Sequence, residues 1–416
     1  MVAGQSDEGQ RAGGRLAVRT VPVPDPGDLV TLLPQPAAVA WIRGGEGLAG
    51  WGEAARIELP AGEDRFAAGE KLLRALFDTA AVDDQVGVPG CGPVAFGSFT
   101  FDPASDGSVL VVPSVVAGRR GGQAWLTTIG DGADPLTPVQ PVTVPAGVRW
   151  HDGSLAAPQW QRAVAAAVER IKAGVLQKVV LARDLHATAS APLDTRALLR
   201  RLAARYPGCY TFSCAGLVGS TPELLISQEA EEVRSLVLAG TVPRGGTPGE
   251  DEALGAALLA SAKDIEEHCY AVDSVRDVLM PLCDRLAIAA TPSLLRMADV
   301  QHLATEVHGT LARETSALTL AGALHPTAAV CGTPADVAME LIRELEGMDR
   351  GRYAGPVGWV DARGNGEWGI ALRCGEIDGP RARLFAGGGI VAGSDPQAEL
   401  AEAQSKFRPM QYAIEG

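Results

Sequence analysis

The amino-acid sequence predicts a mixed α/β fold of one large unit with two subdomains. A chain of 416 residues with 46% hydrophobic content can bury a large core, as one large domain or two smaller ones. Before residue 150, short apolar runs are separated by Gly and Pro, whereas helical and strand patterns alternate after it. The Pro-rich segment 131–147 separates these two kinds of sequence pattern, so we expect an N-terminal subdomain at 16–150 and a second region at 151–416.

The N-terminal subdomain is expected to be rich in strands. Apolar runs at 39–42, 94–99 and 109–116 have the pattern typical of strands joined by turns. One helix is expected at 62–78, where large apolar residues recur near helical spacing. Residues 1–15 are polar and glycine-rich without an apolar segment, so we expect a disordered tail rather than a signal peptide.

Helices and strands alternate in the second region. The sequence predicts a helix at 160–171, a buried strand at 175–182 and another amphipathic helix at 194–206. The longest helical pattern covers 250–285, with apolar residues along one stripe. A C-terminal helix is expected to begin at 394–396, because Ser-Asp-Pro supplies an N-cap and a first-turn proline.

The excess of acidic residues limits the possible partners. The 36 Lys and Arg against 50 Asp and Glu give a net charge of −14, which argues against nucleic acid or an anionic membrane. An anionic substrate would then need local positive charge or a metal ion. No apolar run approaches about 18 residues, so no membrane span is expected. Seven scattered cysteines without a C-x-x-C pair predict neither a disulfide framework nor a zinc site, and favour a reducing cytoplasm.

Lys178 and Glu223 are candidates for acid–base chemistry. Lys178 lies within an apolar strand pattern, where an ammonium is costly to bury unless it is paired or its pKa falls. It is either a general base or an edge-strand lysine whose amine reaches water, and the residues alone leave both interpretations open. Glu223 follows Thr-Pro and precedes Leu-Leu-Ile, so it is either a surface glutamate or a general acid whose pKa is raised by apolar neighbours.

Two pairs of carboxylates are each spaced for one helix face. Asp264 and Glu267 are three residues apart in the long helical pattern, and Glu399 and Glu402 repeat this spacing in the last helix. Each pair alone is usually a solvated helix face. If the two pairs met in space, they would form an all-oxygen site of the kind that Mg²⁺ prefers.

A glycine run and an arginine are candidates for anion binding. Gly387–Gly389 could form a tight turn, or could let backbone N–H groups approach a carboxylate. Arg373 could hold a second carboxylate or serve as an ion-pair partner within the protein. A Gly-x-Gly-x-x-Gly match at 45–50 does not predict a dinucleotide site, because Pro60 follows too soon for the required helix.

These candidates belong to a series of motifs in one order. The motifs are Lys178 in Gln-Lys-Val-Val-Leu-Ala-Arg, Glu223 in Thr-Pro-Glu-Leu-Leu, Ala239-Gly-Thr, Lys-Asp264-x-x-Glu267-His, His302-Leu-Ala-Thr, Leu-His325-Pro-Thr, Tyr353-Ala-Gly, Arg373-Cys, Gly-Gly-Gly-Ile-Val and Glu399-x-x-Glu402. Over about residues 158–410 the chain thereby resembles the chorismate-utilising enzymes and, among them, the isochorismate synthases. The resemblance implies the α/β (α+β type) fold of anthranilate synthase component I, in which two subdomains stack mostly antiparallel sheets with helices outside and the active site in a cleft.

The resemblance also implies a role for each matching residue. Lys178 would activate water for attack at C2 of chorismate, and Glu223 would protonate the departing C4 hydroxyl. The implied ligands of Mg²⁺, the expected cofactor, are Glu267 and Glu402, with Asp264 and Glu399 as outer-shell or alternative ligands. The implied substrate-binding residues are Gly240, Thr241, His302, Ala329, Tyr353, Arg373, Gly387, Gly388, Gly389 and Lys406. No redox or organic cofactor is expected.

A few positions separate the activities within this family. Aminodeoxychorismate synthases carry a lysine where this chain has Ala239, and anthranilate synthases lack the lysine found here as Lys178. Salicylate synthases tend to have a hydroxyl-bearing residue in place of Ala329, although Tyr353 resembles the tyrosine of that lyase type. We therefore predict isochorismate synthase activity, with salicylate synthase and a catalytically silent chorismate-binding homologue as alternatives.

The predicted partner is a small molecule, chorismate. The resemblance implies a monomer that needs no glutaminase subunit. The isochorismate product could feed either menaquinone or siderophore synthesis, since that depends on neighbouring enzymes.

Overall fold

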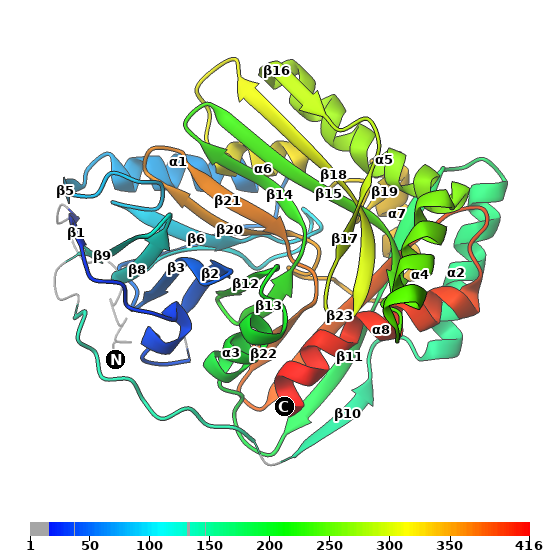
Figure 1. Ribbon diagram of the computed structural model, residues 1–416, viewed down its shortest axis with the longest axis horizontal. Helices are drawn as coiled ribbons and strands as arrows, with labels where there is room; N and C mark the ends of the chain where they lie inside the picture. The colour runs from blue at the N-terminus through cyan, green and yellow to red at the C-terminus, as the bar shows by residue number, and fades with distance from the viewer. Residues whose placement is uncertain (1–15, 37, 131–133, 146) are drawn as a thin grey trace, which may run out of the picture.

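Two β-sheets form the centre of the protein, and helices cover them (Figure 1). The computed structural model describes residues 16–36, 38–130, 134–145 and 147–416, so the tail predicted at 1–15 lies outside the described residues. Within these ranges β1 and β5 pair in parallel and all other strand pairings are antiparallel. The predicted mixed α/β architecture with mostly antiparallel sheets is therefore present.

The first sheet brings the two ends of the second region together. In the described part of the chain its order is β10 (Val148–Asp152), β11 (Lys178–Ala189), β23 (Arg381–Ile390), β22 (Cys374–Asp378), β13 (Leu217–Thr221), β12 (Tyr210–Cys214), β2 (Val39–Arg43), β3 (Glu46–Trp51), β8 (Val115–Arg120), β9 (Gln123–Ile129), β1 (Ala17–Pro22) and β5 (Ala81–Asp84), with β19 (Gly332–Thr333) beside β11. Because β11 pairs with β23, the strand that begins at Lys178 lies against Gly387–Gly389.

The second sheet supplies the opposite wall of the site. Its order is β16 (Cys283–Ile288), β18 (Val300–Leu311), β15 (Glu232–Pro243), β14 (Leu224–Glu229), β21 (Gly366–Ile370), β20 (Pro356–Asp361), β6 (Val94–Ser98), β7 (Ser108–Val112) and β4 (Ala55–Leu59), with β17 (Ser293–Arg296) beside β18. Both sheets contain strands from either side of residue 150. The sheets therefore do not separate at residue 150, and the division into subdomains at 16–150 and 151–416 stays a prediction.

The helices lie on the outer faces of the sheets and beside the site. They are α1 (Arg65–Phe77), α2 (Ala157–Lys172), α3 (Thr195–Arg205), α4 (Pro248–Ala260), α5 (Ala262–Leu279), α6 (Ala317–Leu324), α7 (Ala335–Leu345) and α8 (Pro396–Glu415), with short 3₁₀ turns at Leu29–Leu32 and Met280–Leu282. Helix α8 packs on β23 and contacts α2 and α3, whereas α5 packs on β15 (Figure 1). Among the helices described, none is long and apolar enough to cross a membrane.

Two buried clusters hold these layers together. Trp41 and Phe212 of the first sheet share one core with Phe96 and Trp368 of the second, so the sheets pack face to face. Burying such a side chain stabilises the fold by roughly 1.5–3 kcal/mol each. A second cluster, which includes Phe407, lies between the outer face of the first sheet and helices α3 and α8. It holds α8 against β23, next to the glycine run.

Two predicted elements are each divided in the structure. The apolar run 109–116 forms two strands, β7 and β8, in different sheets, with Pro113 between them. Proline has no N–H to donate to a ladder, so the change of sheet occurs there. The helical pattern 250–285 forms α4 and α5, because Ser261 leaves the helical conformation and its side chain accepts a hydrogen bond from the N–H of Asp264. The expected start of the last helix is confirmed, since Asp395 caps α8.

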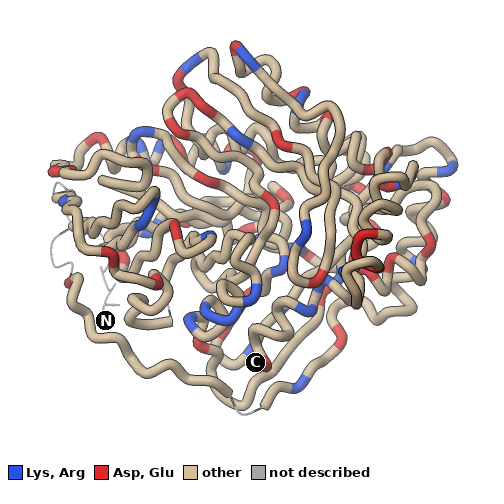
Figure 2. Tube along the Cα trace, viewed as in Figure 1, with Lys and Arg blue, Asp and Glu red and all other residues tan. Residues whose placement is uncertain are grey.

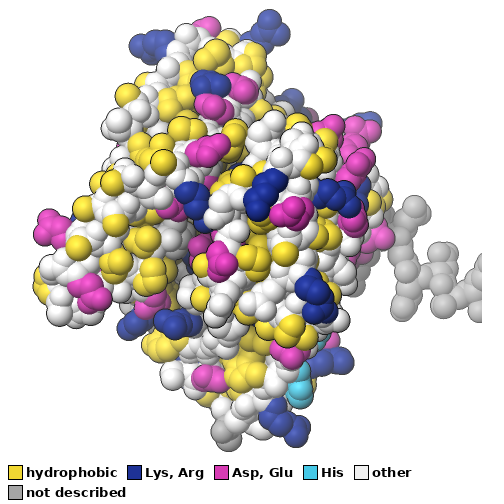
Figure 3. Space-filling view, turned by 90° about the vertical axis from the view of Figure 1, so that its right-hand side faces the viewer, with side chains coloured by type: hydrophobic (Ala, Val, Ile, Leu, Met, Phe, Trp, Pro, Cys, Tyr) yellow, Lys and Arg dark blue, Asp and Glu magenta, His cyan; other side chains and the backbone are white. Residues whose placement is uncertain are grey.

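Charged residues are spread over the whole molecule. Lys and Arg and Asp and Glu are scattered along the trace, in all parts of the molecule (Figure 2). Hydrophobic, acidic and basic side chains are likewise mixed on the face seen in Figure 3. The net charge of −14 is therefore not concentrated in one region, and the local charges around a site decide which ligand it attracts.

Candidate active site

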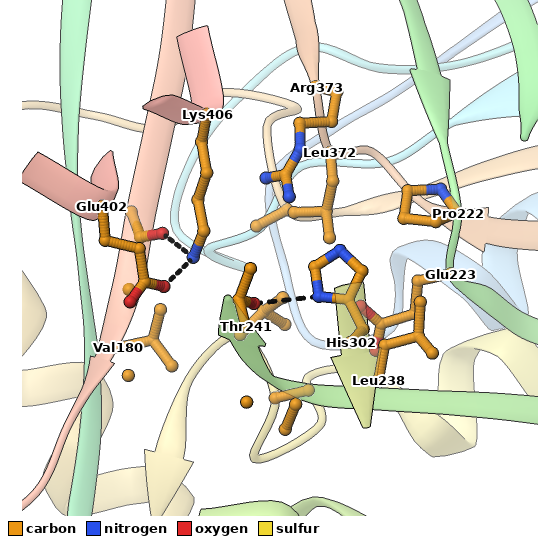
Figure 4. A pocket seen from close by; sticks show the side chains of 18 of the residues that line it. Val180, Pro222, Glu223, Leu238, Thr241, His302, Leu372, Arg373, Glu402 and Lys406 are labelled. Atoms are coloured by element: carbon orange, nitrogen blue, oxygen red, sulfur yellow. Dashed lines mark hydrogen bonds and ion pairs between the residues drawn. The ribbon is translucent and has the colours of Figure 1, made fainter. Parts of the chain in front are cut away.

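A pocket lies where β11, β15, β23, α5 and α8 come together (Figure 4). The predicted site residues that line it are Glu223, Gly240, Thr241, Glu267, His302, Ala329, Tyr353, Arg373, Gly387, Gly388, Gly389, Glu402 and Lys406. Three predicted residues, Lys178, Asp264 and Glu399, are not part of the lining. Motifs separated by more than 200 residues in sequence thus meet at one place.

Lys178 is buried, and its amine lies next to Glu267 of the pocket lining. Its side chain is 0% exposed, so the amine does not reach water. The Nζ atom lies 3.3 Å from Oε1 of Glu267, an ion pair by distance whose angles do not make a hydrogen bond. Side chains alternate along a strand, so Lys178 lies on the same face of β11 as Val180. Val180 lines the pocket.

Glu223 lies at the turn between β13 and β14 and is 5% exposed. Burial raises the pKa of its carboxyl to about 8, even though Lys178 and a backbone hydrogen bond from Leu238 favour the charged form. Its carboxyl is therefore mostly protonated at neutral pH. A protonated carboxyl inside a pocket can donate a proton to a leaving group.

Gly387–Gly389 form an open strand edge at the pocket. β22 pairs with β23 only from Arg381 to Leu384, so the glycines have no strand partner on that side. A Cβ atom at Gly389 would lie 2.1 Å from Oε1 of Glu267, and one at Gly387 would lie 2.5 Å from a backbone oxygen of β11. A side chain at Gly387 would collide with the backbone, and one at Gly389 would displace the carboxylate of Glu267.

Lys406 and Arg373 give the pocket positive charge. The Nζ atom of Lys406 lies 2.6 Å from Oε1 of Glu402 and donates a hydrogen bond of 2.8 Å to the carbonyl oxygen of Gly387. The guanidinium of Arg373 points into the pocket beside Leu372 (Figure 4). Arg373 has φ +48°, a backbone conformation that is rare for residues other than glycine and that turns the chain at the end of β21.

Thr241 and His302 form a hydrogen-bonded pair on the opposite wall. A bulge between Ala239 and Thr241 interrupts the pairing of β15 with β18, and Gly240 has φ +79° there. The hydroxyl of Thr241 lies 2.9 Å from Nδ1 of His302 (Figure 4). Burial, with Arg373 and Lys406, lowers the pKa of His302 to about 3, so its ring is neutral. Its buried Nε2 atom has no hydrogen-bond partner among the residues that the structure describes.

The four predicted metal-binding carboxylates do not form one cluster. Glu267 and Glu402 line the pocket, whereas the carboxylate of Glu399 is held by Lys263 at 3.1 Å and by the Ser394 hydroxyl at 2.7 Å. The carboxylate of Asp264 accepts a hydrogen bond from the Ser261 hydroxyl. Among the residues that the structure describes, no three His, Cys, Asp or Glu side chains are grouped to hold a metal ion.

Glu267 and Glu402 nevertheless fit one Mg²⁺ ion. Both are carboxylates, the oxygen donors that Mg²⁺ prefers, and they reach the same pocket past glycines without side chains. Mg²⁺ usually takes only one or two protein carboxylates and completes its shell with water and substrate oxygens. Two carboxylates are therefore a sufficient protein contribution.

The pocket contains residues that the sequence analysis did not identify. Val180, Leu238 and Leu372 supply apolar walls, and Arg350 lines the pocket close to Tyr353. Apolar lining residues look like ordinary core residues in a sequence. A signal for Arg350 was present, because Glu346 precedes it by four residues, a spacing typical of helical ion pairs.

Comparison with known proteins identifies the family. Residues 141–415 match the family described as chorismate binding enzyme, and this chain belongs to that family. The putative isochorismate synthase MenF of Mycobacterium tuberculosis is 42% identical over 339 residues, which cover 78% of this chain and 87% of that protein. The predicted family is therefore confirmed, and the relative agrees with the predicted activity.

Solved structures agree with the fold. The putative 2,3-dihydroxybenzoate-specific isochorismate synthase DhbC of Bacillus anthracis superposes with a TM-score of 0.78 at 31% identity, covering 93% of this chain and 98% of that chain. Anthranilate synthase component I of Streptococcus pneumoniae has a TM-score of 0.67 at 20% identity, over 99% of this chain and 95% of that one. The prediction of an anthranilate synthase component I-like fold is confirmed.

Proposed function

We propose that this protein is an Mg²⁺-dependent isochorismate synthase, an isomerase that converts chorismate to isochorismate. The observation that carries the proposal is the placement of a buried amine and a protonated carboxyl around one pocket. Lys178 has a side chain with no solvent exposure, and burial raises the pKa of Glu223 to about 8. One group can accept a proton while the other donates one, as an exchange of hydroxyl groups requires.

In the proposed reaction one water enters and one water leaves. The amine of Lys178 takes a proton from the water as the water oxygen bonds to C2 of the ring. The ring double bonds shift, and the C4–O bond breaks as Glu223 gives its proton to the departing hydroxyl. The proton balance is restored when Lys178 loses its proton and Glu223 regains one, so no net proton is consumed.

The remaining pocket residues would hold the dianionic substrate. Arg373 and Lys406 provide positive charge, and the open edge at Gly387–Gly389 offers backbone N–H groups to a carboxylate. Glu267 and Glu402 would hold Mg²⁺, which would neutralise a ring carboxylate when bound. Asp264 and Glu399, each held by its own hydrogen bonds, would support the metal site from outside. The neutral His302 with Thr241 would orient the ring.

One incubation tests the proposal. Purified protein is mixed with chorismate and Mg²⁺, without ammonia, and the products are separated by chromatography. Isochorismate as the main product supports the proposal, and absence of turnover would show a catalytically silent homologue. Omission of Mg²⁺ in a parallel sample tests the cofactor separately.

Salicylate synthase is the second candidate because Tyr353 lines the pocket. A tyrosine at this position resembles the lyase type, and it is stacked on Phe385 at 5.1 Å. Salicylate together with pyruvate in the same incubation would favour this alternative. We expect a cytoplasmic monomer without a glutaminase subunit, whose product supplies menaquinone or siderophore synthesis.

A further inference from the structure

Glu346 and Arg350 form a buried ion pair at the pocket wall, where Arg350 is part of the lining and Glu346 is not, and the proposed reaction does not use it. Their side chains are 1% and 2% exposed, and the guanidinium binds both carboxylate oxygens, with Nε 2.9 Å from Oε2 and Nη2 2.5 Å from Oε1. Burying two charges costs several kcal/mol per ion, which their attraction offsets only with good geometry and further hydrogen bonds. The hydrogen bonds that this ion pair makes to other elements therefore indicate its role in the structure.

The further side-chain hydrogen bonds described for the pair go to backbone groups of β11 and of the loop at Val330. The carboxylate of Glu346 accepts a bond of 2.7 Å from the N–H of Ala182. Arg350 donates to the carbonyl oxygens of Val180 at 2.8 Å and of Val330 at 2.9 Å. Val180 and Val330 both line the pocket, so one ion pair joins strand β11 to the loop that contains Ala329.

The middle of β11 needs these contacts because it has no strand neighbour on one side. β19 pairs with β11 only at Lys178 and Val179, and β10 pairs only beyond Asp184. Between these two pairings, Val180 and Ala182 each form a non-hydrogen-bonded pair with the residue opposite on β23. Their N–H and C=O groups therefore point away from β23. A buried strand edge of this kind must find other partners for its N–H and C=O groups.

Each of these four outward groups has a partner. The N–H of Val180 donates to the carbonyl oxygen of Cys331 at 2.7 Å, and its C=O accepts from Arg350. The N–H of Ala182 donates to Glu346, and its C=O accepts from the indole of Trp160 at 3.0 Å. The ion pair supplies two of the four partners, and Lys178 lies two residues before Val180 on the same strand.

We infer that Glu346 and Arg350 are positioning residues for the proposed reaction, which fix the strand that carries the Lys178 amine relative to the loop at Ala329. This inference rests on the proposed function. Neither side chain needs to touch the substrate, because the pair acts through the backbone of Val180, Ala182 and Val330. A displacement of about 1 Å in a catalytic group can lower turnover about a hundredfold.

The fold offers a matched control far from the pocket. Asp194 and Arg196 form another buried ion pair, with side chains 2% and 1% exposed, and Arg196 donates to the carbonyl oxygens of Pro34 and Gln140 at 2.9 Å. Neither residue lines the pocket. Changes at this pair should therefore cost stability without moving Lys178.

The experiment compares Arg350→Lys with Arg196→Lys. Both variants lose the bidentate pair, so we expect similar falls in Tm. With chorismate, Arg350→Lys should lower kcat about a hundredfold with KM changed less than about threefold, whereas Arg196→Lys should retain a near-normal kcat. Equal kcat values in the two variants, measured well below both melting temperatures, overturn the inference.

Hydrogen exchange provides a readout that does not depend on activity. In Arg350→Lys without substrate, the peptide that contains Val180 and Ala182 should exchange faster than in Arg196→Lys, and equal exchange overturns the inference. If the wild-type protein makes no isochorismate, the proposed function fails while this exchange comparison still decides the positioning role. If Arg350→Lys does not fold, Glu346→Gln is compared with Asp194→Asn by the same two measurements and the same criteria.

Discussion

Glu223 and Glu402 face one pocket from opposite sides, yet the protein shifts their pKa values in opposite directions (Figure 4). Burial raises the pKa of Glu223 to about 8, since Lys178 and Arg373 act on it without a direct ion pair. Burial also favours the neutral form of Glu402. There it is outweighed by Lys406, whose amine is 2.6 Å away, so the pKa of Glu402 is lowered.

This comparison shows that contact with a cation, rather than burial alone, decides which carboxyl keeps its proton. The pocket thereby has a carboxyl with a raised pKa on one side, at Glu223, and one with a lowered pKa on the other, at Glu402. In the proposed reaction Glu223 protonates the leaving hydroxyl, and Glu402 on the other side helps to bind a metal ion. Substitutions on the two sides should therefore have different consequences.

The largest effect is expected from Lys178→Ala. Loss of the amine removes the proposed base, so kcat should fall by about 10²–10⁴-fold. The circular dichroism spectrum should stay that of a folded protein. Lys172→Ala, on the exposed side of α2, is the control and should retain normal kcat. Near-normal turnover in Lys178→Ala would refute the assignment of this lysine as the base.

The next effect is expected from Glu223→Gln, which removes the proton donor. We expect kcat to fall on the order of 10²-fold. In the wild-type enzyme kcat/KM should decline above pH about 8, because Glu223 then loses its proton. A pH profile measured from 6 to 10 checks this, and a profile without that decline would contradict the role of Glu223.

The same substitution should stabilise the protein at high pH. Between pH 4.5 and about 8 the unfolded chain has lost the proton that folded Glu223 retains, so the wild type loses stability as the pH rises. Glutamine has no charge to bury, so Glu223→Gln should have a higher Tm than the wild type at pH 8. Equal melting temperatures of the two proteins at pH 8 would show that burial of the Glu223 carboxyl does not destabilise the fold.

The comparison of the two sides also shows how much the sequence could predict. Lys178 and Glu223 could be named as candidates because both belong to the series of motifs that resembles the chorismate-utilising enzymes, whereas each residue alone left a structural interpretation open. The burial that raises the pKa of Glu223 comes from tertiary packing, which no local sequence pattern predicts. Whether Lys178 reached water was open for the same reason.

The spacing of the carboxylates correctly predicted which of them share a helix, but not which groups each carboxylate binds. Asp264 and Glu267 share α5, yet only Glu267 lines the pocket, because Ser261 binds the carboxylate of Asp264 at the start of the helix. The break at Ser261 was not predicted, since the apolar stripe continues across it. The hydrogen bonds of Arg350 to Val180 and Val330 are tertiary, so they depend on segments that are distant in sequence.

A smaller effect is expected from Glu402→Gln, which changes the Glu402 side alone. Loss of one ligand charge should weaken metal binding on the order of tenfold or more. A titration with Mn²⁺ followed by electron paramagnetic resonance, without chorismate, measures this directly. Glu399→Gln is the control and should have a smaller effect, because Lys263 and Ser394 hold that carboxylate outside the pocket. An unchanged titration in Glu402→Gln would count against this residue as a ligand.

The smallest effect is expected from Ala329→Thr, which changes neither carboxyl but adds a hydroxyl to the pocket lining. Ala329 lines the pocket, and salicylate synthases tend to carry a hydroxyl at the corresponding position. We expect isochorismate to stay the main product and salicylate with pyruvate to appear as minor products, measured by chromatography. Ala329→Val is the control, because valine has nearly the volume of threonine but no hydroxyl. Equal salicylate from the two variants would mean that pocket volume, rather than hydrogen bonding, limits the lyase reaction.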